Sequence, residues 1–102
     1  MNIDECLKII LFILHNKFGK KSFTLNEFRD ILNNISFILT KIGSILYLRD
    51  ILRVRKFIKI YTIPISVEAS GEYLTYIKIT RKGILYIKNI NNKEIVKLLL
   101  HP

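Results

Sequence analysis

The sequence predicts one domain of the α+β class, with helices in both halves of the chain and a β-hairpin between them. Two patterns carry this prediction. Apolar residues recur at intervals of three and four through the first half of the chain, as on the buried face of a helix. From residue 57 to residue 80 the side chains alternate instead, around a Ser70-Gly71 turn signal, which is typical of two strands joined by a turn. The length of 102 residues fits one such domain with one core.

The first helix is predicted from Ile3 to Phe18. Its apolar stripe comprises Ile3, Leu7, Ile10, Leu11, Leu14 and Phe18. Ile9, Phe12 and Ile13 fall outside this stripe, so the helix is apolar nearly all round. Such a helix must be covered on more than one side, and self-association is the economical way for a short chain to achieve this. We therefore expect a homodimer that forms through the first and the last helices.

The second helix is predicted from Leu25 to about Asn33, after a break at residues 19–22. Thr24-x-x-Glu27 is a capping box, in which each side chain satisfies a backbone N–H group that has no partner inside the helix. The pair Asn33-Asn34 tolerates the conformations with which a chain leaves a helix, so we place the end of the second helix there.

The third helix follows a linker at residues 35–39, and Thr40 is predicted to cap it. We expect it to end at Arg53 or Arg55, where crowded basic residues complement the helix dipole. Its predicted core stripe is Ile42, Ile45, Leu48 and Leu52. Its opposite face carries Gly43, Ser44, Tyr47 and Asp50, with Lys41, Arg49 and Arg53 on the shoulders.

Two strands come next, one from Phe57 to Ser66 and one from Tyr73 to Thr80, both rich in β-branched and aromatic residues. Pro64 cannot donate a hydrogen bond to a neighbouring strand, so we expect it on a sheet edge or at a bulge. Thr80 is then predicted to cap a fourth helix from Arg81 to about Asn89. A final amphipathic stretch, Lys93 to Leu100, is expected to be helical and to pack on the first helix or on a partner.

The chain is strongly basic. Seventeen Lys and Arg residues against eight Asp and Glu residues give a formal net charge of +9 and a pI near 9.9. This charge favours a polyanionic partner, either nucleic acid or an acidic membrane surface, over a merely solvated basic surface. The basic residues are not gathered on one amphipathic helix, which makes membrane-surface binding the least favoured of these interpretations.

The compartment is expected to be intracellular. Asp4 and Glu5 stand where the basic start of a signal peptide would be, and the longest apolar run is far too short to span a membrane. Cys6 is the single cysteine, so no disulfide can form within the chain. We favour Cys6 as a small apolar core residue, and a bridge between two copies stays open.

The sequence carries no pattern of an enzyme or of a metal site. His15 and His101 lie at opposite ends of the chain, and the acidic residues are scattered rather than clustered. Gly-rich phosphate loops and nucleophile motifs are absent from the sequence. We therefore expect neither catalysis nor a cofactor.

Three passages together resemble a known family. They are the capped helix from Thr24 to Asn33, the passage Leu48-Arg49-Asp50-Ile51-Leu52 that continues to Phe57-Ile58-Lys59, and Tyr76-Ile77-Lys78-Ile79-Thr80-Arg81-Lys82-Gly83. In this order they are similar to the winged helix-turn-helix regulators, especially small archaeal and archaeal-virus members like the MarR and PadR groups. The resemblance covers residues 3–90. It implies a winged helix with three N-terminal helices, a β-hairpin wing and one or two C-terminal helices.

The resemblance also implies double-stranded DNA as the partner and transcription regulation as the function. The third helix would lie in the major groove and the wing, with its tip at residues 67–72, would reach the minor groove or the backbone. Carried onto this sequence, the positions that would read bases are Lys41, Ser44, Tyr47 and Arg49. The positions that would contact phosphates are Lys20, Lys21, Lys41, Arg53, Arg55, Arg81 and Lys82.

The position of Arg81 and Lys82 gives a physical argument for a phosphate partner. Cations in the first turn of a helix oppose its dipole, unless an anion is bound there. The alternative function is a small α+β module that binds another protein, which the high apolar content and the acidic wing residues Glu68 and Glu72 favour. Basic residues on one continuous face would favour DNA over this alternative.

Overall fold

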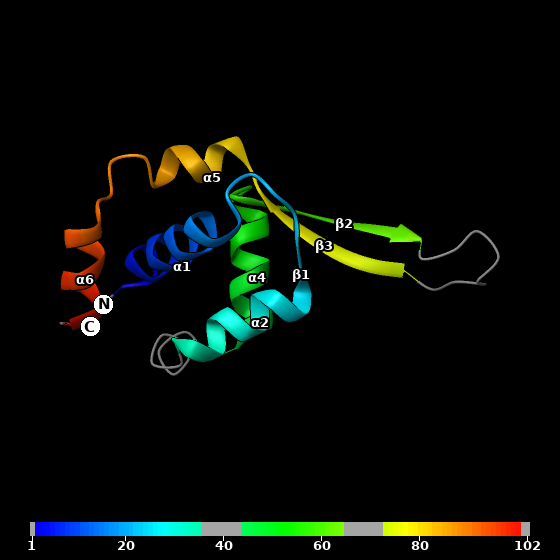
Figure 1. The fold of residues 1–102 in the computed structure, drawn as a ribbon, viewed down its shortest axis with the longest axis horizontal. Coiled ribbons are helices and arrows are strands. Elements are labelled where there is room, and N and C mark those ends of the chain that lie inside the picture. The colour runs from blue at the N-terminus through cyan, green and yellow to red at the C-terminus, as the bar shows by residue number, and fades with distance from the viewer. Residues whose placement is uncertain (1, 36–43, 65–72, 101–102) are drawn as a thin grey trace.

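The computed structural model describes residues 2–35, 44–64 and 73–100, the last three as backbone only. The described chain is an α+β fold with five helices and one three-stranded antiparallel sheet (Figure 1). The elements in chain order are α1 (Ile3–Phe18), β1 (Phe23–Thr24), α2 (Leu25–Asn34), α4 (Ile45–Val54), β2 (Ile58–Pro64), β3 (Tyr73–Ile79), α5 (Arg81–Tyr86) and α6 (Asn92–Leu100). The predicted α+β class and the predicted hairpin are confirmed.

The sheet has the strand order β1-β3-β2. In β2 and β3, Ile58 faces Ile79 and Ile60 faces Ile77, and these isoleucines point into the core. The sequence did not predict β1, because a strand of two residues has no alternation to detect. It becomes a strand only by pairing with β3, where Phe23 faces Ile77. Pro64 ends β2, which pairs only with β3, so the prediction that Pro64 lies on a sheet edge is confirmed.

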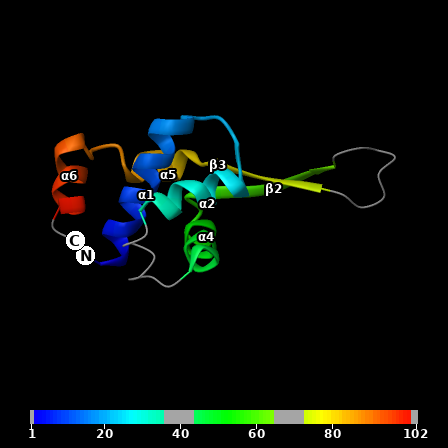
Figure 2. The same cartoon turned by 60° about the horizontal axis from the view of Figure 1, so that its bottom comes forward.

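Helix α1 is buried within the single chain. It contacts α2, α5 and β3, and Ile9 and Ile10 are both fully buried (Figures 1 and 2). Phe12 and Ile13 are half-buried and pack on the same core. The expectation that a chain this short would not itself cover the helix on more than one side is therefore wrong. Sequence reasoning failed here because it could not foresee that the sheet and α5 would cover the remaining sides.

Cys6 lies in this core with 1% of its surface exposed, as the interpretation of a small apolar core residue predicted. A bridge between two copies through Cys6 would require the core to open.

The start of the third predicted helix is corrected. Helix α4 begins at Ile45, and Ser44 caps it by accepting a hydrogen bond from the Tyr47 backbone N–H at 3.1 Å. Ser44 has extended backbone angles, which the interior of a helix does not allow. Thr40 and Lys41 lie outside the described residues. The predicted core residues Leu48 and Leu52 are fully buried.

The other predicted caps are confirmed. Thr24 and Glu27 form the capping box of α2, with both reciprocal bonds present. Thr80 caps α5 by accepting a hydrogen bond from the Gly83 N–H at 3.1 Å. Helix α5 ends at Tyr86 rather than at the predicted Asn89, since the next backbone bonds span three residues instead of four and tighten the chain into turns.

Candidate nucleic-acid interface

The predicted contact residues fall into two groups. Five belong to α4 and its ends, namely Ser44, Tyr47, Arg49, Arg53 and Arg55. Four lie where the segment after α1 meets the start of α5, namely Lys20, Lys21, Arg81 and Lys82. Lys41 lies outside the described residues, and so does the wing tip with Glu68 and Glu72.

The outer surface of α4 is both polar and apolar. Tyr47 and Arg53 are exposed on it, as the sequence predicted for groove-facing residues. Leu46 and Val54 are exposed beside them, at 51% and 72%. Ser44 acts as the cap, so its hydroxyl oxygen already accepts one backbone bond.

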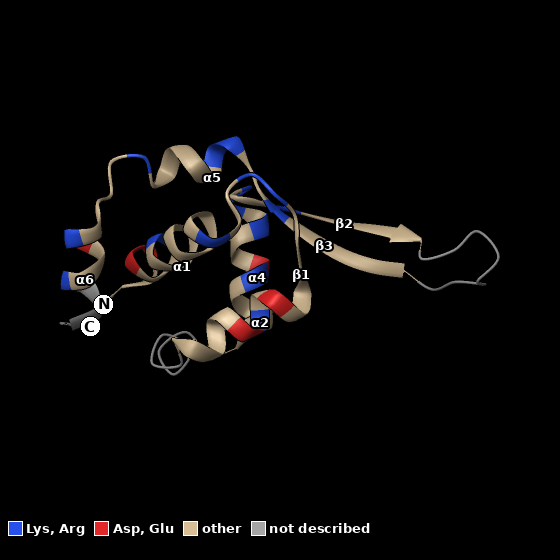
Figure 3. Cartoon of the chain, viewed as in Figure 1, with Lys and Arg blue, Asp and Glu red and all other residues tan. Residues whose placement is uncertain are grey.

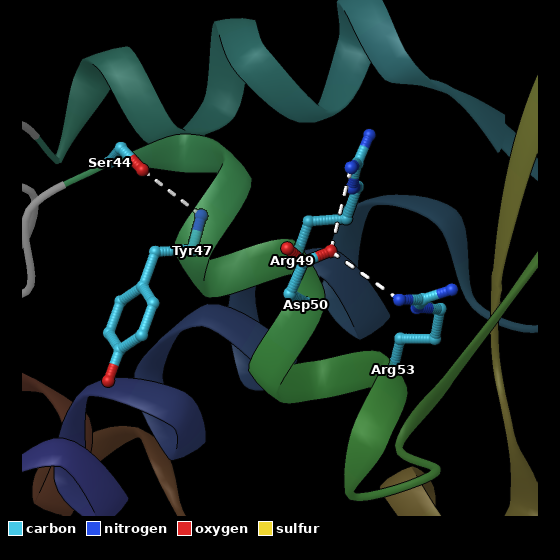
Figure 4. A network of polar contacts seen from close by, with 5 residues as sticks. All are labelled: Ser44, Tyr47, Arg49, Asp50 and Arg53. Atoms are coloured by element: carbon cyan, nitrogen blue, oxygen red, sulfur yellow. Dashed lines mark hydrogen bonds and ion pairs between the residues drawn. The ribbon is translucent and has the colours of Figure 1, made fainter.

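A small network of charges lies along α4. Asp50 forms ion pairs with Arg49 at 3.5 Å and with Arg53 at 3.8 Å, and Figure 4 shows its carboxylate between the two guanidinium groups. Each arginine uses one terminal nitrogen for this contact, so other donors of the five on each guanidinium remain for a ligand. The Arg49 Nε is buried without a hydrogen-bond partner. The network fixes both arginines at one side of the helix, while Tyr47 leaves on the other (Figure 4).

Arg55 performs a structural task. Its Nη1 donates to the Asp4 carboxylate at 2.5 Å and so joins the end of α4 to the start of α1. This hydrogen bond raises the pKa of Arg55 above its usual value. Because Asp4 already neutralises it, Arg55 is poorly suited to bind a phosphate.

Two residues of the second group, Lys20 and Arg81, line a cavity of about 520 Å³. Lys20, Lys78 and Arg81 supply its charged lining, and Ile79, Ile84 and Leu85 supply its apolar lining. The structure thus brings together two predicted residues, Lys20 and Arg81, that are 61 positions apart in the sequence. Lys78 was not predicted as a site residue, although strand alternation could have placed it on the outer face of the hairpin.

Lys21 and Lys82 follow Lys20 and Arg81 directly in the sequence, and both are exposed. The Lys82 ammonium lies 5.6 Å from the centre of the Phe57 ring, a distance at which a cation is attracted to an aromatic face.

The start of α5 is held against the chain between α4 and β2. The Thr80 hydroxyl donates to the Lys56 carbonyl at 2.6 Å, and the Thr80 N–H donates to the Phe57 carbonyl at 3.0 Å. Gly83 lies so close that a Cβ there would be 2.4 Å from the Phe57 oxygen. Close packing against Phe57 therefore requires glycine at position 83 of the Thr80-x-x-Gly83 motif. The Thr80 cap also fixes the start of α5, where Arg81 and Lys82 lie.

Charge is distributed unevenly over the molecule. The described acidic residues lie on α1, α2, α4 and α6, whereas basic residues gather where β3 meets α5 and where the chain enters β1 (Figure 3). The ion pairs formed between described residues involve Arg49, Arg53 and Arg55, and none of the lysines.

Within residues 2–35, 44–64 and 73–100, no three His, Cys, Asp or Glu side chains are grouped closely enough to hold a metal ion. The helices in the same ranges are all too short or too polar to cross a membrane. Comparisons with protein-family models, with curated proteins and with solved structures gave no match to this chain.

Proposed function

We propose that this chain is a winged-helix protein that binds double-stranded DNA, with α4 in the major groove and the β2–β3 hairpin as the wing, and that it regulates transcription. The observation that carries the proposal is the pairing of α4 with an adjacent hairpin in a chain of net charge +9. Helix α4 contacts β2, and the order of elements is compatible with a winged-helix layout.

The chemistry of α4 supports this role. Arg53 and Tyr47 are exposed, and Arg49 is oriented by Asp50. An arginine that is held in place binds phosphate or the edge of guanine at a lower cost in side-chain entropy. We assign phosphate contacts of the duplex at α4 to Arg53, and phosphate contacts on the sheet side of the molecule to Lys20, Lys21, Arg81 and Lys82. Arg55 is left out because Asp4 occupies it. Lys41 stays a predicted contact of both kinds.

A homodimer remains part of the proposal, because two copies would read two half-sites about one turn of DNA apart. Helix α6 is the better candidate for the dimer contact. Ile95 is buried, but Val96 is 51% exposed on the next position. Sedimentation or light scattering of the purified protein tests this part.

Binding to duplex DNA tests the function directly. Fluorescence anisotropy with a mixed-sequence duplex, across salt from about 50 to 200 mM, should show saturable binding that weakens steeply as salt rises. Absence of binding at the lowest salt would overturn the proposal.

The role of α4 needs variants on a selected cognate duplex. Tyr47→Ala with Arg49→Ala should reduce the preference for the cognate over a scrambled duplex by about tenfold or more, since each base contact carries roughly 1–3 kcal/mol. Val54→Ala is the matched control, because Val54 is 72% exposed on the same helix. An unchanged preference in the double variant would refute the assignment of α4.

The alternative is a module that binds another protein. It is favoured by the exposed Leu46, Tyr47 and Val54 and by a cavity of about 330 Å³ that Tyr47 and Val54 line with Ile3 and Ile51. The preference for the cognate over the scrambled duplex separates the two functions, because a protein-binding module of net charge +9 can bind duplex DNA at low salt without preferring a sequence.

A further inference from the structure

We infer that the outer face of the sheet is a second binding surface for duplex DNA, which holds a different duplex segment from the one at α4. This inference rests on the proposed function, and it adds that one molecule bridges two duplexes. We call this surface the outer sheet face and define it by Lys59, Tyr61, Tyr76 and Lys78.

Strand alternation separates this face from the core. Ile58, Ile60, Ile77 and Ile79 point to one side of the sheet and join the core cluster. The residues between them therefore point to the other side. Leu48 and Leu52 of α4 belong to the same core. Since α4 and the sheet share one core, the outer surface of α4 and the outer sheet face point away from each other.

A pair of like charges marks the outer sheet face. Lys59 and Lys78 are direct cross-strand partners, and both are exposed. Side chains in this relation lie about 5 Å apart at their Cβ atoms, and like charges there are destabilising. The ion pairs among the described residues include neither lysine. An anion bound between the two ammonium groups would remove the repulsion, and a DNA phosphate is such an anion.

The next cross-strand pair is aromatic and is held in place. Tyr61 and Tyr76 face each other, with ring centres 5.8 Å apart. The Tyr61 hydroxyl is hydrogen-bonded to the Ser22 hydroxyl, which lies just before β1. Because β3 runs between β1 and β2, this bond reaches across the middle strand. The face is therefore ordered before a ligand arrives, which lowers the entropy lost on binding.

The positive charge continues beyond the sheet. Lys78 shares its cavity with Lys20 and Arg81, so the cations form a row from Lys59 across β3 to the start of α5. The six described acidic residues lie on α1, α2, α4 and α6 (Figure 3). A row of cations without carboxylates fits the regular spacing of phosphates along a DNA backbone. It has no feature that reads bases, so we expect binding at this face to be independent of sequence.

The experiment is a capture assay. A cognate duplex is fixed to beads and the protein is added. A second, labelled duplex of unrelated sequence follows, and the amount retained on the beads is measured. The wild-type protein should capture it at about 50 mM salt and release it at about 200 mM. Lys59→Gln with Lys78→Gln should lower capture by about tenfold or more, because two phosphate contacts are lost. The same variant should still bind the bead duplex.

The matched control removes the same charge from α2 and from the chain after α5, through Arg29→Gln with Lys88→Gln, both exposed. It should capture like the wild type. Equal losses in both variants would mean that only net charge matters and would overturn the inference. The inference would also be overturned if the Lys59/Lys78 variant captured as much labelled duplex as the wild type. The two α4 helices of a dimer would then hold the two duplexes.

Two further outcomes are distinguishable. If the protein binds the bead duplex but captures a labelled single strand in preference to a duplex, the occupant is wrong while the proposed function stands. If the protein does not bind the bead duplex at all, the proposed function fails and the bridge fails with it.

Discussion

Lys56 carries a backbone conformation that a lysine rarely adopts. Its φ is +62°, in the left-handed region. The Phe57 N–H donates to the Leu52 carbonyl and the Lys56 N–H to the Arg53 carbonyl, both at 2.9 Å. These two bonds are a Schellman motif, the helix ending in which glycine usually takes this position. Lys56 therefore keeps α4 short at a conformational cost.

Lys56→Gly should consequently stabilise the fold. Relief of the left-handed strain exceeds the extra entropy that glycine gains on unfolding, and we expect a net increase of about 0.5 kcal/mol in the free energy of unfolding. Lys56→Val should lower it by about 1 kcal/mol or more, because a branched Cβ worsens the strain. Urea denaturation measures both, and a stabilising valine would contradict the argument.

Gly83 is constrained by space instead. In Gly83→Ala the new methyl group would lie 2.4 Å from the Phe57 oxygen, so α5 must move or the Thr80 bonds must stretch. We expect a loss of about 2 kcal/mol or more in the free energy of unfolding. Leu85→Ala, at a 55% exposed position of the same helix, is the control and should change it much less. An unchanged free energy of unfolding in Gly83→Ala would show that α5 can move away from Phe57 without loss of stability.

At the scale of elements, the sequence predicted a helix start correctly where the capping interaction lies within a few consecutive residues. The capping box at Thr24 and the Thr80 cap involve residues three apart, so the sequence contains the whole interaction. The start of α4 failed because Thr40 and Ser44 are both good caps, and only the surrounding structure chooses between them. Strand β1 exists only through its pairing with β3.

The candidate site shows the same limit. The basic residues and the exposed Tyr47 could be predicted, since charge and helix periodicity are local properties. The ion pair of Arg55 with Asp4 could not, because it joins residues 51 positions apart. That Lys59 and Lys78 are cross-strand partners could not be predicted either, because it depends on the register in which β2 pairs with β3. A turn centred on Ser70-Gly71 would set Lys78 opposite Ile63, whereas the structure sets Leu74 there.

The boundary of α4 is itself testable. Ser44→Ala should lower the free energy of unfolding by about 1 kcal/mol, because the Tyr47 N–H loses its acceptor. Ser44→Asp should retain most of the stability, since its carboxylate caps equally well and suits the positive end of the helix. Equal stability of the alanine variant and the wild type would mean that α4 does not depend on this cap.

At the scale of the whole molecule, one small cluster connects three helices. Arg55 at the end of α4 is bound to Asp4 of α1, and the Tyr86 phenol of α5 responds to both charges. Burial, reinforced by the negative charge of Asp4, raises the pKa of Tyr86 above its usual value near 10. The folded protein therefore holds this phenol proton more tightly than the unfolded chain does.

This difference makes stability depend on pH in the alkaline range. The contribution of Tyr86 is fully present below pH about 10 and declines as the pH rises through the higher value of the folded state. Urea midpoints measured between pH 9 and 11 should fall less in Tyr86→Phe than in the wild type. All other residues are the same in both proteins, so parallel curves would show that Tyr86 is not responsible.

The hydrogen bonds of Thr80 to Lys56 and Phe57 affect where this protein can accept insertions. They hold β2 and β3 together at the base of the hairpin, at the opposite end of the strands from residues 65–72, and the β2–β3 pairing continues from there. For a loop that joins two strands fixed at their base, the entropic cost of closure grows only slowly with length. Doubling its length from eight to sixteen residues should cost only about 0.6 kcal/mol. Insertions can accumulate at the outer end of the hairpin while its base, and the charges beside it, stay where they are.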